Sequence, residues 1–173
     1  MKTKTRITFF LAPMIYFLDQ FTKNLVLHFL TLGERISIIP GYFDLVSFRN
    51  TGAAFGIFSE VEDPYRSLFF YGIGIVALVA LAFFYRSLQN NEKLMPTTLA
   101  LILGGLLGNF TDRIRLGSVV DFLSFHYQDH VADFSLFGKT FFFALEWPAF
   151  NVADAAISTA MILLLISMWK KPA

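Results

Sequence analysis

Four long stretches with few charged residues constrain this chain more than any motif does: residues 7–28, 67–84, 96–116 and 149–169. Each is close to the roughly 20 residues that an α-helix needs to cross a hydrocarbon core of about 30 Å. The whole chain is 55% hydrophobic and only 16% charged, which is too apolar for an ordinary soluble domain. The sequence therefore predicts an α-helical membrane protein, a single domain over residues 1–173 with four transmembrane helices.

The basic residues predict how these helices are oriented. They cluster before the first stretch, between the second and third, and after the fourth: Lys2, Lys4, Arg6, Arg86, Lys93, Lys170 and Lys171. Because basic residues favour the cytoplasmic side, we expect both termini and the 85–95 loop in the cytoplasm. The longer segments 29–66 and 117–148 then lie on the outer face, where we expect the functional residues. The first stretch lacks a convincing small-residue cleavage site, so we expect a retained helix rather than a removed export signal.

The first outer segment carries the pattern of a small β element. Residues 36–39 and 42–48 are rich in apolar residues, and Pro40 and Gly41 between them form a turn signal. The following residues, 49–56, include glycines that permit close backbone approach. We expect short extracytoplasmic strands followed by a re-entrant or surface loop, in which residues 49–52 act as a flap over the site.

Two aspartates, Asp121 and Asp154, lie at the outer ends of the third and fourth stretches. A carboxylate at the edge of a membrane is costly unless it is partnered or used. Two carboxylates brought together by adjacent helices are the minimum equipment of an aspartic protease, in which they share one proton and act as base and acid. The alternative for Asp154 is helix capping with Asn151, but capping does not account for Asp121. Which aspartate starts as the base stays open, although a helix N-terminus favours the charged form of Asp154.

Polar residues inside the first and third stretches add to this predicted site. Asn109, Asp112 and Arg113 follow the small-residue run 104–108 at helical offsets of three and four, so they share one face. The alternative is a helix packing interface topped by an ion pair between Asp112 and Arg113. Asp19 and Lys23 lie one turn apart, either as a neutral plug or in a supporting role in the site. The supporting role is favoured because intramembrane ionisable residues usually face an interior cavity.

Other functional classes find less support in the sequence. Cysteine is absent, which excludes disulfides and a cysteine nucleophile. His126 and His130 are four residues apart but lack a clear third ligand, so we expect no metal and no cofactor. No basic stripe with interleaved aromatic residues points to nucleic acid. A small transporter or channel is the main rival, but it requires polar residues along the full depth of the bundle, and here they gather toward one side.

Five motifs, in order along nearly the whole chain, resemble those of one known family. They are DQFTK at 19–23, RNTGAAF at 49–55, GLLGNFTDR at 105–113, VVDF at 119–122 and FNVAD at 150–154. The chain resembles bacterial lipoprotein signal peptidase, also called signal peptidase II. The resemblance implies an inner-membrane aspartic endopeptidase that removes the signal peptide of prolipoproteins, just before a cysteine that carries a diacylglyceryl group. It also implies inhibition by the cyclic peptide globomycin.

The resemblance also implies roles for individual residues. Asp121 and Asp154 resemble the catalytic pair of the family. The supporting or substrate-binding set comprises Asp19, Lys23, Asn50, Gly52, Asn109, Asp112, Arg113 and Asn151. The expected partners are a lipid-modified prolipoprotein and membrane lipids, with the enzyme acting as a monomer. Two departures concern the outer loop: Ser118 stands where many members have histidine, and residues 124–146 are longer and richer in phenylalanine than the family pattern.

Overall fold

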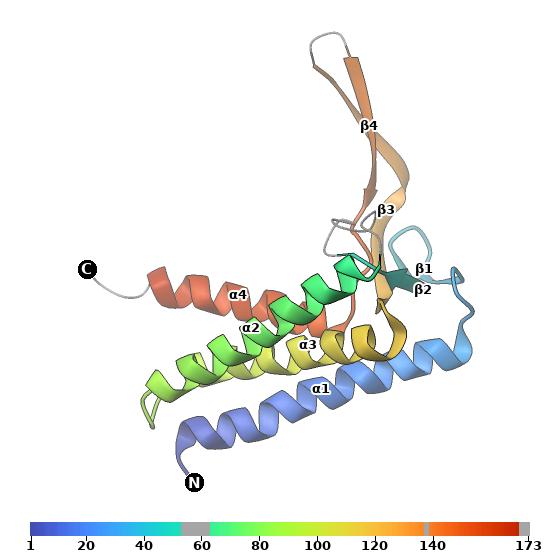
Figure 1. The fold of residues 1–173 in the computed structure, drawn as a ribbon. Helices are drawn as coiled ribbons and strands as arrows, with labels where there is room; N and C mark the ends of the chain where they lie inside the picture. The colour runs from blue at the N-terminus through green and yellow to red at the C-terminus, as the bar shows by residue number, and fades with distance from the viewer. Residues whose placement is uncertain (53–62, 137–138, 170–173) are drawn as a thin grey trace.

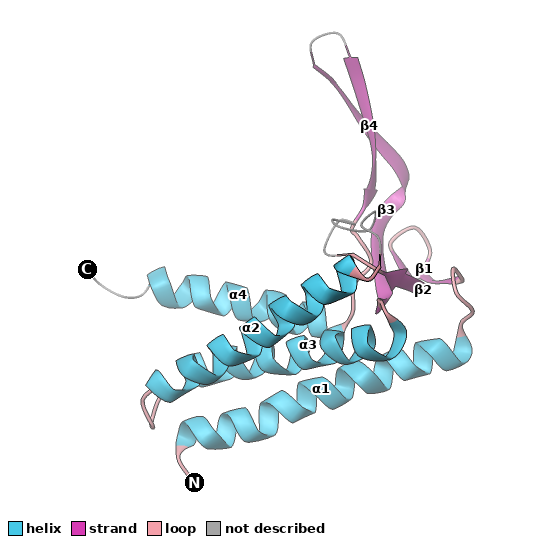
Figure 2. Cartoon of the chain, viewed as in Figure 1, coloured by secondary structure: helices cyan, strands magenta, loops and turns pink. Residues whose placement is uncertain are grey.

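Helices and one antiparallel sheet make up the computed structural model, which describes residues 1–52, 63–136 and 139–169, the side chains of 129–144 excepted (Figure 1). The helices are α1 Thr3–Phe29, α2 Tyr65–Ser87, α3 Leu94–Leu116 and α4 Val152–Trp169. The strands are β1 Arg35–Ile39, β2 Phe43–Asn50, β3 Val119–Leu136 and β4 Lys139–Glu146. Figure 2 shows the helices together on one side and the strands at one end of them.

The helical part has the character of a membrane protein. Three of the described helices, α2, α3 and α4, are long and apolar enough to cross a membrane. α1 has the length, with 27 residues, but Asp19, Gln20 and Lys23 interrupt its apolar sequence. The described helices run side by side, and the N-terminus lies at the end opposite the sheet (Figure 1). Exposed apolar side chains cover α2, where Gly74 alone is buried, as expected for a surface that contacts lipid.

α3 is the central helix and packs against α1, α2 and α4. Glycines permit this close packing. A Cβ on Gly104 would lie 2.7 Å from the backbone oxygen of Ala12 in α1, and a Cβ on Gly105 would lie 2.6 Å from that of Ala153 in α4. Real Cβ atoms do not come within 3.0 Å of such atoms, so only glycine fits here. The small-residue run therefore brings the polar side chains of α1, α3 and α4 within reach of one another.

The sheet confirms the β element expected after the first helix. Its strand order is β1-β2-β3-β4, with neighbouring strands antiparallel. The predicted turn joins β1 and β2, where Gly41 has a φ of +81° and the N–H of Tyr42 donates to the oxygen of Ile39 at 2.9 Å. The segment that follows α3 contains more order than the sequence indicated, because β3 and β4 form a long hairpin that projects away from the helices (Figure 1).

A tight turn carries the chain from α3 into β3. Gly117 has a φ of +69°, and its N–H donates to the oxygen of Arg113 at 3.0 Å, which ends the helix. Val120 and Phe122 of β3 then pack with Val26 of α1 in a buried apolar cluster. Since side chains alternate along a strand, Asp121 is directed away from this cluster.

Candidate active site

A cavity of about 450 Å³ lies where α3, α4 and the sheet meet. Both aspartates singled out from the sequence line it. Its polar lining includes Asn50, Asn109, Arg113, Asp121, Asp154 and Ser158, and apolar lining comes from Val119, Trp147, Pro148, Ala149, Phe150 and Ile157. Asp121 reaches the cavity from β3 and Asp154 from the first turn of α4, so segments distant in sequence bring the two carboxylates to one space.

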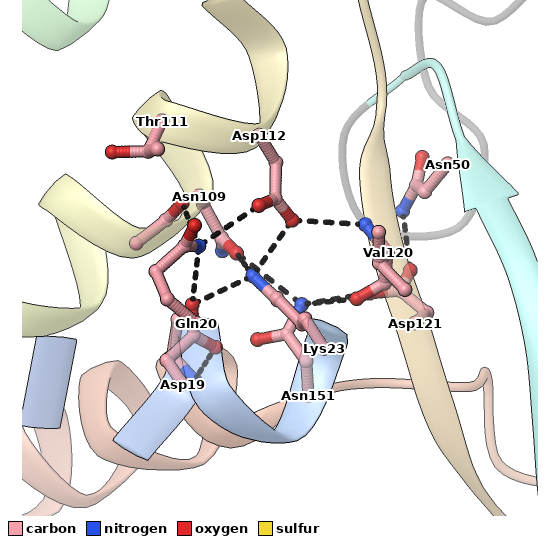
Figure 3. Close-up of polar contacts among 12 residues, drawn as sticks. Asp19, Gln20, Lys23, Asn50, Asn109, Thr111, Asp112, Val120, Asp121 and Asn151 are labelled. Carbon is pink, nitrogen blue, oxygen red and sulfur yellow. Dashed lines mark hydrogen bonds and ion pairs between the residues drawn. The ribbon is translucent and has the colours of Figure 1, made fainter. Parts of the chain in front are cut away.

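Asp121 is buried, with 4% of its surface exposed, and both of its oxygens accept hydrogen bonds. Asn151 Nδ2 donates to Oδ1 at 2.8 Å, and Asn50 Nδ2 donates to Oδ2 at 3.1 Å (Figure 3). Burial and the neighbouring charge of Asp154 raise the pKa of Asp121 to about 7, since both disfavour the ionised form. Asp121 is therefore able to hold a proton near neutral pH.

Asp154 has a different set of contacts. Asn109 Nδ2 donates to its Oδ1 at 2.8 Å, and the backbone N–H of Asn151 donates to its Oδ2 at 3.3 Å. Asp154 also lies in the first turn of α4, where the positive end of the helix dipole favours a negative charge. Asp154 therefore receives two N–H donors at the start of α4.

Asn151 both caps α4 and belongs to the site, although these two roles were alternatives in the sequence analysis. Its Oδ1 accepts from the N–H of Asp154 at 2.9 Å, which caps α4. Its Nδ2 lies 3.2 Å from both Asn109 Oδ1 and the oxygen of Val120, in addition to the shorter contact with Asp121. Asn151 is fully buried and contacts both members of the aspartate pair.

Beside the cavity lies a buried cluster that joins α1 to α3 (Figure 3). The ion pair expected between Asp19 and Lys23 is present at 2.9 Å, but it is not an isolated plug. Lys23 Nζ also lies 3.0 Å from Asp112 Oδ2 and donates to Asn109 Oδ1 at 2.8 Å. The alternative interpretation, an interfacial ion pair between Asp112 and Arg113, is therefore wrong among the described residues. Asp112 pairs with Lys23 instead.

Arg113 points instead to the cavity and to the start of the expected flap. Its Nη2 donates to the oxygen of Gly52 at 3.0 Å, and its guanidinium carbon lies 4.4 Å from the ring centre of Phe70 in α2. Asn50 Oδ1 accepts from the N–H of Gly52 at 3.0 Å, which forms a local turn at the end of β2. Residues 49 and 50 end β2, and whether residues 49–52 move as a flap stays a prediction, since nothing in the structure reports motion; residues 53–56, which follow, lie outside the described residues.

Gln20 was not among the residues predicted from the sequence, although it neighbours Asp19. It is buried, and its Nε2 donates to Asp112 Oδ1 at 2.9 Å, to the oxygen of Gly108 at 3.1 Å and to Asp19 Oδ2 at 3.2 Å. The signal that could have identified Gln20 is that it is an uncharged polar residue inside an apolar stretch. The segment from Trp147 to Phe150 was also missed, because its residue types carry no chemical signature.

No group of three metal-ligating side chains was found among the described residues. His126 lies 3.8 Å from Asp44 Oδ2, on the sheet and outside the lining of the aspartate cavity, while the side chain of His130 is outside the described set. Ser118, the departure noted beside the VVDF motif, is buried and its Oγ lies 3.5 Å from the oxygen of Leu116. It therefore takes part in the turn after α3.

Comparison with known proteins identifies the family. A family model described as "Signal peptidase (SPase) II" matches residues 11–170, which is nearly the whole chain. The chain belongs to the signal peptidase II family. A relative from Syntrophotalea carbinolica, named lipoprotein signal peptidase, is 42% identical over 95% of this chain and 92% of its own length. Another of that name, from Geobacter metallireducens, is 38% identical over 97% of this chain and 93% of its own length.

Two solved structures have a similar fold. One structure, described as a bacterial membrane enzyme, superimposes with a TM-score of 0.77 at 30% sequence identity, covering 98% of this chain and 91% of the other. A second of the same description gives a TM-score of 0.76 at 30% identity, covering 99% of this chain and 97% of the other. The arrangement of helices and sheet seen here is thus similar to that of known members of this fold.

Proposed function

We propose that this signal peptidase II family member is an aspartic endopeptidase whose dyad is Asp121 and Asp154. Its substrate is a prolipoprotein whose cysteine already carries a diacylglyceryl group, and the bond broken is the peptide bond just before that cysteine. The observation that carries the proposal is the shared cavity, in which two carboxylates from β3 and α4 receive donors from the same residue, Asn151.

The two aspartates are assigned different roles, because Asp154 lies at the positive end of the α4 dipole and Asp121 is buried. Asp154 starts ionised and takes a proton from a water molecule as that water attacks the scissile carbonyl carbon. Asp121 starts protonated and donates a hydrogen bond to the carbonyl oxygen, which stabilises the negative charge that develops there. When the carbon–nitrogen bond breaks, the amine of the lipid-bearing cysteine leaves with a proton from the dyad. The pKa of about 7 for Asp121 supports its assignment as the acid.

Polar residues around the dyad are proposed to hold the substrate backbone. Arg113 and Asn50 line the cavity, where Arg113 donates to the oxygen of Gly52 and Asn50 accepts from its N–H. A peptide entering here therefore meets two fixed polar side chains and the start of the flap. Asn109 and Asn151, also in the predicted supporting set, donate hydrogen bonds to the dyad, and Gly52 lines the cavity at the start of the flap. Globomycin, a cyclic peptide, is proposed to occupy this same cavity.

The proposed placement has all four helices crossing the inner membrane, with both termini in the cytoplasm and the dyad at the outer face. Basic residues near the N-terminus and in the α2–α3 connection lie at the end opposite the sheet, which supports this orientation. Membrane lipids then surround the exposed apolar faces of α2 and α4. The apolar signal helix enters sideways from the bilayer while the diacylglyceryl chains stay in lipid, and a monomer is sufficient because both aspartates come from one chain.

The test is cleavage of a diacylglyceryl-modified precursor by purified Asp121→Asn and Asp154→Asn variants in detergent or lipid. Both variants are expected to lose turnover while inserting and folding normally. Asp44→Asn is the matched control for kcat, because Asp44 is also a buried aspartate of the sheet but does not line the cavity. Near-normal turnover by either dyad variant removes that residue from the catalytic role, and globomycin should block the product formed by the wild type and by the control.

A further inference from the structure

Two buried carboxylates hold the backbone directly beside the proposed catalytic aspartates. Asp112 Oδ2 accepts from the N–H of Val120, the residue before Asp121, at 3.1 Å. Asp19 Oδ1 accepts from the N–H of Ala153, the residue before Asp154, at 2.9 Å. Among the described residues, neither Asp19 nor Asp112 lines the cavity. These two carboxylates therefore act on the chain segments that carry the dyad and not on the substrate.

Lys23 ties the two carboxylates together. Its ammonium lies 2.9 Å from Asp19 Oδ2 and 3.0 Å from Asp112 Oδ2, so one cation spans α1 and α3 (Figure 3). Lys23 is 1% exposed, and water is therefore not available to replace either contact. Through this cation, the position of the β3 segment is linked to the position of the start of α4.

The third hydrogen of the Lys23 ammonium fixes the orientation of the side-chain amide of Asn109. It is donated to Asn109 Oδ1 at 2.8 Å. Because an ammonium has three donors and no acceptor, the atom that faces it must be the amide oxygen. The amide nitrogen of Asn109 is then turned to Asp154 Oδ1, at 2.8 Å. An N–H donor on a carboxylate favours the ionised form, which is the form that activates water.

We infer that Lys23 is a positioning residue for the peptidase reaction. Through Asp19 and Asp112 it sets the separation of the two segments that carry the dyad. Through Asn109 it keeps an N–H donor on Asp154. This inference rests on the proposed function of the dyad, and it goes beyond that function by giving Lys23 a role in the geometry of catalysis. A purely structural role would be compensation of buried negative charge, and the two roles make different predictions.

The double variant Asp19→Asn with Lys23→Met distinguishes the positioning role of Lys23 from a purely structural role. It removes one positive and one negative charge, so the net charge of the cluster is unchanged, and the new amide side chain keeps an oxygen for the N–H of Ala153. Positioning predicts a fall in kcat of about 100-fold with little change in KM, since misplacement of reacting groups by about 1 Å has effects of that size. The melting temperature should fall, because Asp112 is left buried without its ammonium partner, so kcat is measured well below the melting temperature of the variant. Wild-type kcat in this variant would overturn the inference.

Lys4→Met is the matched control. Lys4 also tethers α1 through its ammonium, which donates to the oxygens of Leu88 at 2.6 Å and Tyr85 at 3.3 Å, but at the end of the bundle away from the dyad. Its loss should lower the melting temperature and leave kcat unchanged. An equal fall of kcat in Lys4→Met would show that any loosened helix impairs turnover, and would overturn the specific role of Lys23.

Two measurements keep the inference testable if the double variant does not fold. Lys23→Arg keeps the positive charge but spreads its donors over a planar fork, so reduced kcat is expected, and unchanged kcat would overturn the inference. Hydrogen exchange on the wild type should show protection at the amides of Val120 and Ala153, and rapid exchange at both would overturn it as well. If the dyad variants are inactive while Lys23 variants keep wild-type kcat, only the positioning role fails; turnover by a dyad variant would instead remove the proposed function.

Discussion

Asn151 and Asp154 bond reciprocally at the start of α4. The side-chain oxygen of Asn151 accepts from the N–H of Asp154 at 2.9 Å, and the carboxylate of Asp154 accepts from the N–H of Asn151 at 3.3 Å. This is the geometry of a capping box, with an aspartate in place of the usual glutamate. Because the amide nitrogen of Asn151 also donates to Asp121, the cap of α4 and the link between the two carboxylates are made by one side chain.

Asn151→Ser should separate the helix-capping role of Asn151 from its hydrogen bond to Asp121. Asn151→Ser keeps a good capping oxygen but removes the amide donor to Asp121, so we expect kcat to fall by about 100-fold, as when one donor is lost from a site that stabilises developing charge. The free energy of unfolding should fall by about 1–3 kcal/mol, because the buried oxygen of Val120 also loses its amide donor. Asn151→Ala should show the same loss of kcat together with a further loss of about 1 kcal/mol of stability, the usual value of an N-cap. Wild-type turnover by Asn151→Ser, measured beside its melting temperature, would contradict a role for the link.

The pH dependence of cleavage should report Asp121. If Asp121 acts as the acid, kcat/KM should fall as the pH rises through about 7, because the proton held there is lost. Stability should change in the same range. The pKa of Asp121 is raised from its ordinary value of 3.8 to about 7, so between these values the folded chain keeps a proton that the unfolded chain has released. The free energy of unfolding should therefore fall with rising pH across this window and stay level above it.

Asp121→Asn removes the titrating carboxyl group of residue 121 and is therefore the control for the pH dependence of stability. Its free energy of unfolding should lack the downward slope between 3.8 and about 7 that the wild type shows. Chemical denaturation at a series of pH values measures the slope in both proteins. The same slope in the variant would assign the titration to another group.

The helices and the aspartate pair were predictable because each leaves a signal in residue types. Long apolar runs mark the helices, and ionisable residues inside or beside those runs are costly enough to mark a site. The hydrogen bonds from Val120 and Ala153 to buried carboxylates leave no such signal, since any residue except proline supplies a backbone N–H. The direction of Asp112, toward Lys23 and not toward Arg113, depends on how α3 is rotated against α1, which the shared helical face alone does not determine.

The hairpin of β3 and β4 shows a second limit of sequence reasoning. Its base is fixed by contacts between β3 and the segment that follows β4: the N–H of Trp147 donates to the oxygen of Phe125 at 2.8 Å, and that of Phe150 to the oxygen of Leu123 at 3.0 Å. Backbone pairing of this kind depends on register, and a one-residue shift would still present an apolar sequence. The hairpin nevertheless matters for the site, because these bonds place the 147–150 segment along the cavity.

Gly105 should be intolerant of even one methyl group. A Cβ there would lie 2.6 Å from the backbone oxygen of Ala153 and 2.9 Å from Cγ1 of Ile157, so Gly105→Ala must push α4 away from α3. Overpacking of this kind costs about 1–3 kcal/mol, and here it also lengthens the contact between Asn109 and Asp154. We expect lower stability together with reduced kcat. Gly72→Ala in α2 is the matched control, since nothing lies within 4 Å of the added Cβ, and it should behave as the wild type in both assays. Equal effects of the two substitutions would show that packing of α3 on α4 does not set the site.

Arg35 joins three strands at the base of the sheet, and its loss should affect binding more than chemistry. Its guanidinium lies 2.8 Å from Asp44 Oδ2 and 2.7 Å from Glu146 Oε1, and Ser124 Oγ donates to the same oxygen of Glu146 at 3.0 Å. The side chains of Arg35 and Glu146 are each 39% exposed, so solvent screens this pair and its loss in Arg35→Gln should cost less than about 1 kcal/mol. The Asp44 side chain is only 5% exposed, so the loss of its cation adds to the cost of Arg35→Gln.

Glu146 directly precedes Trp147 of the cavity lining, which makes this contact relevant to the substrate. Loosening it in Arg35→Gln should raise KM for the lipid-modified precursor while kcat stays unchanged, because the dyad and its donors lie outside the contact. Arg35 lowers the pKa of Glu146, so the pair stabilises the fold above the ordinary value of 4.5 and this contribution is lost as the pH falls through the lowered pKa. The difference in stability between the wild type and Arg35→Gln should therefore shrink in acid and in high salt. A fall in kcat with unchanged KM would instead place Arg35 among the residues that position the dyad.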